Sequence, residues 1–239
     1  MADLDGDGIK DLYTGCYEGG LYWMRGEKDH TFHAPAAILD SSGAVLRAGM
    51  FWDNEQKKWA NMNTPLGIAA AAVDWDDDGD LDLILGSQDG GMYLRRNEGT
   101  AKAMKFASLT ILDQLFASAN EELQAGDQPL RVEGGHAMPV ACDWDGDGRF
   151  DLLSGSGEGG AWWFRNIGEP GKPRFAAGER LVPKASGVWA EPGERTQVHV
   201  ADFDGDGKLD LLLGDYHGKQ VSEGKYEWHG WVWVFRRKA

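Results

Sequence analysis

Asp143-Trp-Asp-Gly-Asp-Gly-Arg-Phe-Asp151 is one of four copies of the nine-residue stretch that decides the fold. The other copies are Asp3-Leu-Asp-Gly-Asp-Gly-Ile-Lys-Asp11, Asp74-Trp-Asp-Asp-Asp-Gly-Asp-Leu-Asp82 and Asp202-Phe-Asp-Gly-Asp-Gly-Lys-Leu-Asp210. Every copy has Asp at its positions 1, 3, 5 and 9 and Gly at position 6, and a leucine follows it. We number the copies loop 1 to loop 4 in chain order.

The spacing of these acidic residues predicts a cation site in each loop. Alternate Asp side chains on a tightly wound loop converge on one point, and the Gly at position 6 permits the sharp turn. An all-oxygen shell with several carboxylates and flexible geometry suits Ca²⁺ better than Mg²⁺. Without a cation, two carboxylates about 5 Å apart repel each other by about 3 kcal/mol at an effective dielectric constant of about 20. The predicted ligands are the side chains at positions 1, 3, 5 and 9 and the residue at position 7, normally through its backbone carbonyl: Asp3, Asp5, Asp7, Ile9, Asp11, Asp74, Asp76, Asp78, Asp80, Asp82, Asp143, Asp145, Asp147, Arg149, Asp151, Asp202, Asp204, Asp206, Lys208 and Asp210.

Two other interpretations of the loops are weaker. An EF-hand begins with the same spacing, but it needs Glu at position 12 and flanking helices. Position 12 is Thr14, Leu85, Ser154 or Leu213, and a run of strand-forming residues follows position 9. Acidic surface turns are the other alternative, because Asp and Gly are common in turns. Four copies with the same five fixed positions favour the metal sites.

The composition indicates an all-β protein with acidic sites. The chain of 239 residues has 34 Gly and 11 Trp, many in short apolar runs bounded by Gly. Its formal net charge is −15, and four Ca²⁺ ions, each adding two charges, would bring it to −7. No basic patch points to nucleic acid as a partner, and no segment has the length of a transmembrane helix. Two cysteines, Cys16 and Cys142, give no disulfide framework.

The chain repeats a unit of strand, metal loop, strand, Gly-rich turn, strand, short turn and strand. The first Asp residues of successive loops are 71, 69 and 59 residues apart, and a four-stranded unit at such a period is the signature of a β-propeller. We predict one domain over residues 1–239, with blade units at about 1–40, 66–113, 135–183 and 196–239 and insertions at 41–65 and 113–134. Fourth strands are expected within 31–39 and 105–112, a short helix within 113–124, and a polar turn at 214–229.

The third strand of each unit carries two recurring columns. Tyr22, Tyr93, Trp162 and Trp233 form an aromatic column, and Arg25, Arg96, Arg165 and Arg236 form a basic one. Both faces of this strand are apolar, as stacking of blade on blade requires, so we expect the aromatic column to be inter-blade core. A ligand platform is the alternative. The arginines either close each blade against neighbouring carboxylates or carbonyls, which we favour, or bind an anionic ligand.

The stretches Val140–Gly155 and Val200–Gly214 resemble the FG-GAP/VCBS repeat family, the Ca²⁺-binding propeller repeats that also occur in integrin α subunits. Residues 161–168 look like the third strand and turn of that family, and the resemblance covers all four units. It implies that each loop joins the first two strands of a blade and binds Ca²⁺ through its four Asp residues. Loop 2 departs at Asp77, which replaces Gly and could alter the turn while leaving the ligand positions intact.

The resemblance also implies a secreted or cell-surface protein of bacterial style. We expect about four Ca²⁺ ions, no catalytic residues, and a scaffold or adhesion module that binds a glycan or a protein. One alternative is a Ca²⁺-dependent polysaccharide lyase or an accessory domain of such an enzyme. A lyase should show an unrepeated cluster of basic or tyrosine side chains at a groove, whereas the polar residues here recur with the repeat. A structural spacer is the other alternative.

The four units predict a partial or incompletely closed propeller. Loops 2, 3 and 4 each follow a candidate strand, whereas only Met1-Ala2 precede loop 1. The fourth unit has no candidate fourth strand after Arg236. We therefore expect further blades from a longer parent chain, or self-assembly, to complete the ring. The absence of a signal peptide before loop 1 fits an N-terminally truncated chain.

Overall fold

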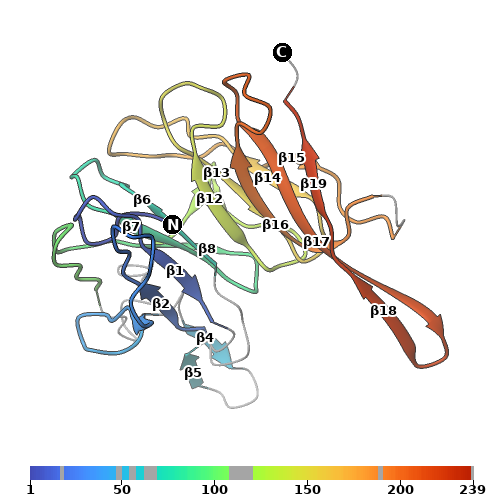
Figure 1. The fold of residues 1–239 in the computed structure, drawn as a ribbon, viewed down its shortest axis with the longest axis horizontal. Coiled ribbons are helices and arrows are strands. Elements are labelled where there is room, and N and C mark those ends of the chain that lie inside the picture. Colours follow the sequence, from blue (N-terminus) through green and yellow to red (C-terminus); the bar gives the residue numbers. More distant parts are fainter. Residues whose placement is uncertain are drawn as a thin grey trace.

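The computed structural model describes residues 1–16, 19–46, 50–53, 58–61, 69–107, 121–187 and 191–237. These residues form small antiparallel sheets and no helix, so the all-β prediction is confirmed (Figure 1). The described part of the chain holds no helix with the length and apolar character of a membrane span.

Four sheets follow one another along the chain, one for each loop. Sheet 1 has the order β1 (Leu12–Gly15), β2 (Leu21–Met24) and β3 (Ala36–Ala37). Sheet 2 has the order β6 (Ala69–Val73), β7 (Asp82–Gly86), β8 (Met92–Arg95) and β9 (Glu121–Glu122). Sheet 3 has the order β12 (Met138–Cys142), β13 (Asp151–Gly155), β14 (Ala161–Phe164) and β15 (Glu179–Val182).

Sheet 4 is built differently. It has the order β16 (Glu194–Ala201), β17 (Asp210–Ser222) and β19 (Val232–Phe235), and the far half of β17 pairs with β18 (Lys225–His229) to form a hairpin outside the sheet. Two short hairpins complete the described strands: β4 (Met50–Asp53) with β5 (Lys58–Asn61), and β10 (Gln124–Ala125) with β11 (Gln128–Pro129).

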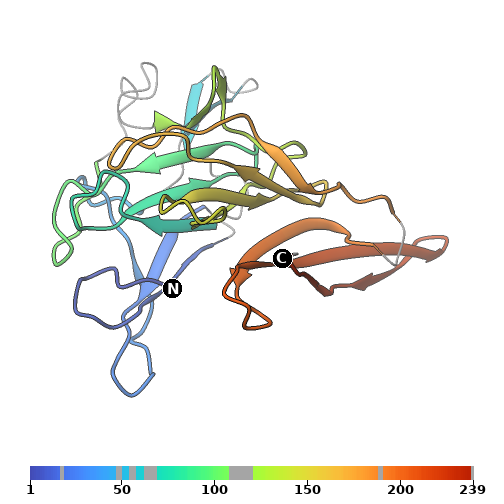
Figure 2. The ribbon, with the colours of Figure 1, turned by 90° about the horizontal axis from the view of Figure 1, so that it is seen from above.

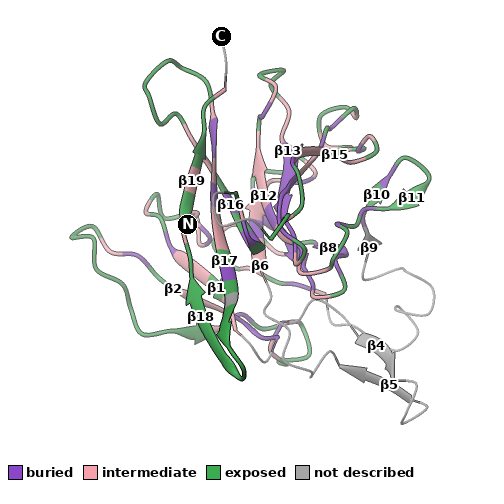
Figure 3. Cartoon of the chain, turned by 90° about the vertical axis from the view of Figure 1, so that its right-hand side faces the viewer, coloured by how far each residue is buried: buried purple, intermediate pink, exposed green. Residues whose placement is uncertain are grey.

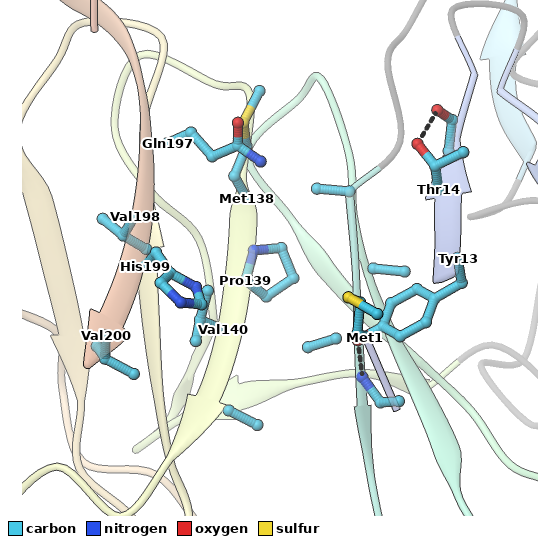
Figure 4. A pocket seen from close by; sticks show the side chains of 16 residues that line it. Met1, Tyr13, Thr14, Met138, Pro139, Val140, Gln197, Val198, His199 and Val200 are labelled. Atoms are coloured by element: carbon cyan, nitrogen blue, oxygen red, sulfur yellow. Dashed lines mark hydrogen bonds between the residues drawn. The ribbon is translucent and has the colours of Figure 1, made fainter. Parts of the chain in front are cut away.

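The first strands of the four sheets meet at a common centre. β1, β6, β12 and β16 line one cavity of about 570 Å³, and their side chains surround it in Figure 4. β1 contacts β6, β6 contacts β12, and β12 contacts β16. The sheets therefore fan out around an axis, as propeller blades do, with sheet 1 and sheet 4 at the two ends of the fan (Figure 2).

Three hydrophobic clusters hold neighbouring sheets together. Successive side chains of the middle strands point alternately into the cluster on one face of the sheet and the cluster on the other. Leu83 and Leu85 of β7 pack toward sheet 1, whereas Ile84 packs toward sheet 3. In β13, Leu152 packs toward sheet 2 and Leu153 toward sheet 4. Successive side chains of a strand point to opposite faces, so a strand buried on both faces is apolar throughout. Among the described residues, no cluster joins sheet 4 to sheet 1.

Three members of the aromatic column belong to this core, as predicted, whereas Tyr22 of sheet 1 belongs to none of the three clusters. Trp162 packs on the cluster between sheets 2 and 3, and its neighbour Trp163 packs on the cluster between sheets 3 and 4. Tyr93 and Trp233 likewise pack against inter-sheet clusters. Arg180 lies over the Trp162 ring at 4.4 Å from the centroid. In sheets 2 and 3 the third strand thus has apolar contacts on both faces, because a sheet lies on either side of it.

The structure corrects several predicted elements. The fourth strand of sheet 2 is β9, not 105–112, of which residues 108–112 lie outside the described residues. Most of the predicted helix over 113–124 also lies outside them, and its described end, from residue 121, is strand. The predicted insertion 113–134 supplies Leu123, Leu130 and Val132 to the core. These apolar residues are separated by polar ones, so no local pattern predicts that they are buried. Pairing with strands far away in the sequence buries them.

Two further corrections concern the ends of the fan. Leu46 lies in the predicted insertion 41–65 but is fully buried between sheets 1 and 2, and the same segment contains the β4–β5 hairpin. In sheet 1 the predicted strand over 31–39 shrinks to β3. The predicted polar turn at 214–229 is the β17–β18 hairpin. In place of a first strand, sheet 1 has a single bridge between Ala2 and Asp11.

Candidate metal centres

The four loops share one backbone conformation. Position 6 has positive φ in every copy: Gly8 at 86°, Gly79 at 91°, Gly148 at 86° and Gly207 at 87°. Position 4 does so as well: Gly6 at 66°, Asp77 at 63°, Gly146 at 80° and Gly205 at 79°. Glycine adopts this left-handed region without steric cost, and Asp tolerates it better than most residues. The substitution at Asp77 therefore leaves the turn of loop 2 unchanged.

The aspartate at position 1 winds the loop around its own side chain. In loop 3, one oxygen of Asp143 accepts the backbone N–H groups of Gly146 and Asp147 at 2.9 and 3.0 Å, and the other accepts that of Gly148 at 3.0 Å. Asp202 makes the same three bonds in loop 4, and Asp3 and Asp74 accept the N–H groups of positions 5 and 6 in loops 1 and 2. These side-chain bonds replace the backbone pairing that a strand would provide, so the loop conformation is encoded locally.

The aspartate at position 9 is buried and fastens the loop to its sheet. Asp11, Asp82, Asp151 and Asp210 are at most 1% exposed. One oxygen of Asp11 accepts the N–H of Leu4 at 2.8 Å, and the other accepts the N–H of Gly26 at 2.8 Å. Asp82 makes the same pair of bonds to Trp75 and Asn97, at 3.0 and 2.6 Å. In loops 1, 2 and 4 position 9 thus ties position 2 to the end of the third strand, whereas in loop 3 the second oxygen of Asp151 accepts Trp163 Nε1.

Positions 1, 3 and 5 converge, as the spacing predicted. In loops 2, 3 and 4 the carboxylates of these three positions each offer an oxygen within 4.8 Å of the others. In loop 1 the cluster is made by Asp3, Asp5 and Asp11, so that position 9 takes part. The structure therefore brings twelve of the predicted ligand side chains into four clusters. Asp7, at position 5 of loop 1, lies outside that cluster and binds Arg25 at 2.7 Å. Ligation by Asp7, by the remaining position-9 side chains and by position 7 stays a prediction.

The carboxylates at position 3 fit a bound cation. One oxygen of Asp5 and one oxygen of Asp145 are buried and have no hydrogen-bond partner. A buried carboxylate oxygen without a partner is costly, and a cation at the cluster would satisfy it. The donor set consists of oxygen atoms only, which is the preference of Ca²⁺. The residues present thus suit Ca²⁺, which would hold the clustered carboxylates of each loop together.

The arginine column (Arg25, Arg96, Arg165 and Arg236) makes a similar contact in each of the four loops. Arg165 Nε lies 2.6 Å from Asp145, and Arg25 Nε lies 2.7 Å from Asp5, so the arginine binds the second oxygen of position 3 in both loops. In loop 2 Arg96 lies 3.5 Å from Asp76, and in loop 4 Arg236 lies 3.9 Å from Asp204. The prediction that these arginines close the blade against carboxylates is confirmed. They also offset part of the negative charge of each loop.

Loop 2 carries two more acidic residues than the others, Asp77 and Asp80. Asp80 at position 7 is 6% exposed, and burial, followed by repulsion from Asp78, Asp76 and Asp74, raises the pKa of its carboxyl. Burial also raises the pKa of Asp82 to about 6, against the opposing effect of its two backbone hydrogen bonds. Both shifts disfavour the ionised forms. A divalent cation at this loop would reverse that preference.

Sequence reasoning missed the structural role of two equivalent asparagines, Asn97 and Asn166, although the sequence carries a signal for it. The pairs Arg96-Asn97 and Arg165-Asn166 end the third strands of sheets 2 and 3. Each asparagine donates its N–H to position 9, and its side-chain oxygen accepts two N–H groups of the following turn. The repeated Arg-Asn pair would have indicated this turn.

Comparison with protein families supports the repeat assignment in the second half of the chain. Residues 143–213 match the FG-GAP-like repeat. This match begins at the first Asp of loop 3, includes β13 to β16 and loop 4, and ends in β17. FG-GAP repeats form propeller blades, which agrees with the fan of sheets. No curated protein matches the chain.

Proposed function

We propose that this chain is a non-catalytic, Ca²⁺-stabilised binding module that works outside the cell or at its surface. The observation that carries the proposal is the convergence of three carboxylates in each of four loops, to within 4.8 Å. Loops 2, 3 and 4 each join the first and second strands of their sheet, and loop 1 leads into β1. Position 9 of every loop is fastened to the end of the third strand of its unit. A cation that stabilises the loop therefore also stabilises the sheet to which the loop is fastened. Extracellular Ca²⁺ modules commonly bind with Kd of about 10⁻⁴–10⁻³ M.

The number of bound ions tests this proposal. We expect about four Ca²⁺ per chain in equilibrium dialysis at ~1 mM Ca²⁺, a concentration at or above such Kd values, and Asp145→Asn should lose one of them. Asp127→Asn is the matched control, because Asp127 is an exposed aspartate outside the loops. An Asp145→Asn chain that stays folded and binds as many ions as the control would contradict the proposal.

The non-catalytic character has its own test. The alternative is a lyase that acts on acidic polysaccharides, and its unsaturated product absorbs ultraviolet light. Incubation of the Ca²⁺-loaded chain with polygalacturonate, alginate and hyaluronate should give no increase in absorbance. A sustained increase that Asp145→Asn abolishes would make the chain an enzyme.

We also propose that another propeller blade covers the outer face of sheet 4. Position 2 of the loop is buried where a following sheet packs on it: Leu4, Trp75 and Trp144 are 2%, 6% and 8% exposed. Its counterpart Phe203 in loop 4 is 56% exposed. On the same side of the fan Val232 and Val234 are 70% and 39% exposed, and apolar surface of this kind usually marks an interface.

Solution mass and shape test the covering blade. If a second copy supplies it, light scattering and small-angle X-ray scattering should show a ring-like dimer or higher assembly. Phe203→Glu should return that assembly to a monomer. If additional repeats of a longer chain supply the blade, that longer chain should be monomeric. Phe203 should then be buried from solvent within it. A stable, compact monomer of 26.2 kDa in which sheet 4 pairs with sheet 1 would contradict both versions.

A further inference from the structure

The β17–β18 hairpin has no counterpart in the other sheets. The connections at the same place are residues 87–91 in sheet 2 and 156–160 in sheet 3. In sheet 4 the chain instead runs on through β17, turns, and returns along β18, so that the hairpin projects from the body (Figure 1). Every residue of β18 is exposed (Figure 3). The side chains of β18 therefore contribute little to the hydrophobic core. Core packing does not explain why this hairpin carries large aromatic residues.

Three aromatic rings form a row on one face of this hairpin. Trp228 stacks between Tyr216 and Tyr226, with ring centroids 5.0 and 5.6 Å apart and interplanar angles of 11° and 18°. The three side chains are 39% (Tyr216), 56% (Trp228) and 51% (Tyr226) exposed. Exposed rings normally lose contact with water when a sheet packs on them, and no described segment does so here. The row keeps its aromatic surface available.

A glycine makes room for the central ring. Gly218 lies directly opposite Trp228 across the hairpin. A Cβ atom added at Gly218 would lie 2.1 Å from a carbon of the Trp228 ring, which is far inside van der Waals contact. Glycine in a strand interior weakens the strand and often marks a close approach. Here it lets the indole lie across the strand between the two tyrosines.

The base of the hairpin is held by an aspartate. Asp215 accepts hydrogen bonds from the N–H of Gly193 at 2.7 Å, from the N–H of Trp231 at 2.8 Å and from Trp233 Nε1 at 2.7 Å. The guanidinium of Arg195 lies 5.8 Å from the centroid of the Tyr216 ring. These contacts fix the inner end of the row to sheet 4, and a fixed site loses less entropy when it binds.

The row forms one wall of a cavity of about 670 Å³, which is in the size range of small-ligand sites. Residues 185–187 form part of its lining, together with Glu194, His217 and Gln220. The cavity thus combines flat aromatic surface with a carboxylate, an imidazole and an amide. Glu194 and Gln220 are exposed and lie at its mouth.

We propose that this cavity binds a segment of uncharged oligosaccharide. Sugar rings have an apolar C–H face that packs on aromatic rings, and hydroxyl groups around their edge that need hydrogen-bond partners such as Glu194 and Gln220. The parallel row suits an extended, flat ligand, whereas a quaternary ammonium ion needs rings arranged around it as a cage. The net charge of −15 opposes a polyanion such as nucleic acid or a sulfated glycan.

The inference rests on the proposal that the chain is a binding module, but its site is separate from the metal loops. Loop 4 precedes β17 at Asp210, and the aromatic row begins at Tyr216, toward the other end of that strand. The sugar therefore does not touch the Ca²⁺ ligands. Each of the two proposals can fail without the other.

A glycan array tests the site. The Ca²⁺-loaded chain should bind neutral glycans on the array, and binding of the best soluble oligosaccharide should quench tryptophan fluorescence. Trp228→Ala should weaken that binding at least about tenfold, as removal of a central aromatic anchor usually does, and Gly218→Val should weaken it by displacing the indole. Phe32→Ala is the matched control, because Phe32 is 41% exposed and lies between β2 and β3, outside the lining of the cavity.

Several outcomes would overturn the inference. These are no binding to any neutral glycan, binding to sulfated glycans only, or equal binding by Trp228→Ala and the control. A dimer that Trp228→Ala dissociates would show that a second copy, not a sugar, covers the row. Ion counting on the same samples separates the proposals: normal Ca²⁺ binding without sugar binding contradicts only this inference. Sugar binding without Ca²⁺ binding contradicts only the metal sites.

Discussion

Loop 3 and loop 4 have the same backbone but opposite surroundings. In both, position 1 winds the turn and the carboxylates of positions 1, 3 and 5 converge. Trp144 of loop 3 is 8% exposed in the cluster between sheets 3 and 4, with Arg237 5.0 Å from its ring centroid. Phe203 of loop 4 is 56% exposed. The loop conformation is therefore local, whereas the stability it confers depends on what packs beside it.

The largest expected difference between the two loops lies at position 2. Trp144→Ala should lower the free energy of unfolding by about 3–5 kcal/mol, because it empties a core between two sheets. In the monomeric chain, in which Phe203 is exposed, Phe203→Ala should change it by at most about 0.5 kcal/mol, as exposed substitutions usually do. Urea unfolding of the two variants checks this. Equal losses would mean that sheet 4 is covered in the isolated chain.

The next largest effect is the stability lost when the position-9 aspartate is substituted. We expect this loss to be similar in loops 3 and 4. Asp151→Ala should cost about 2–3 kcal/mol even in EDTA, because it leaves buried donors of Asn166 and Trp163 without an acceptor. Asp210→Ala should cost a similar amount, because Asp210 accepts the N–H groups of Phe203 and Arg237. If the cost of either variant disappears in EDTA, position 9 acts through the metal alone.

A smaller difference is expected in Ca²⁺ affinity. The carboxylates of loop 4 are all exposed, whereas two of those in loop 3 are half-buried, and Arg165 is closer to its aspartate than Arg236 is. A more preorganised site binds more tightly. At ~1 mM Ca²⁺, a site with Kd between about 10⁻⁴ and 10⁻³ M adds about 0.4–1.4 kcal/mol. The Ca²⁺-dependent stability lost in Asp145→Asn should exceed that lost in Asp204→Asn, as measured by unfolding with Ca²⁺ and with EDTA.

The smallest effect compares loop 2 with loop 3. Asp77 holds a positive φ where loop 3 has Gly146. Asp77→Gly should raise the free energy of unfolding by up to about 1 kcal/mol, because it removes left-handed strain. Gly146→Asp should lower it by a similar amount. Opposite signs in thermal denaturation would show that side-chain interactions of Asp77 outweigh the strain.

The repeat, the loops and the inter-sheet strands could be predicted because their information is local. Leu83, Leu152 and Leu211 each follow position 9 directly, and a strand follows from the apolar run. The role of position 9 could not be told from that of a ligand by spacing, because its partners Gly26, Asn97 and Asn166 lie fifteen residues further along the chain.

The remaining errors come from segments in which few apolar residues stand together. Leu123 lies between Glu122 and Gln124, and Leu46 ends the short run Ala44-Val45-Leu46, so only their pairing with distant strands buries them. The β17–β18 hairpin was predicted as a polar turn because Tyr226 and Trp228 alternate with charged residues. Alternation of apolar and polar residues is also the pattern of a strand with one buried face. In β18 both faces are exposed, and periodicity does not predict that.

Thermal denaturation with and without a chelator tests the central claim most directly, namely that four cation sites stabilise the fan of sheets. Calorimetry of the full chain at ~1 mM Ca²⁺ should give a higher Tm than calorimetry in excess EDTA, since each occupied site adds stability by mass action. Restoring Ca²⁺ after chelation should restore the Tm. A melting curve that is unchanged in excess EDTA would contradict the claim.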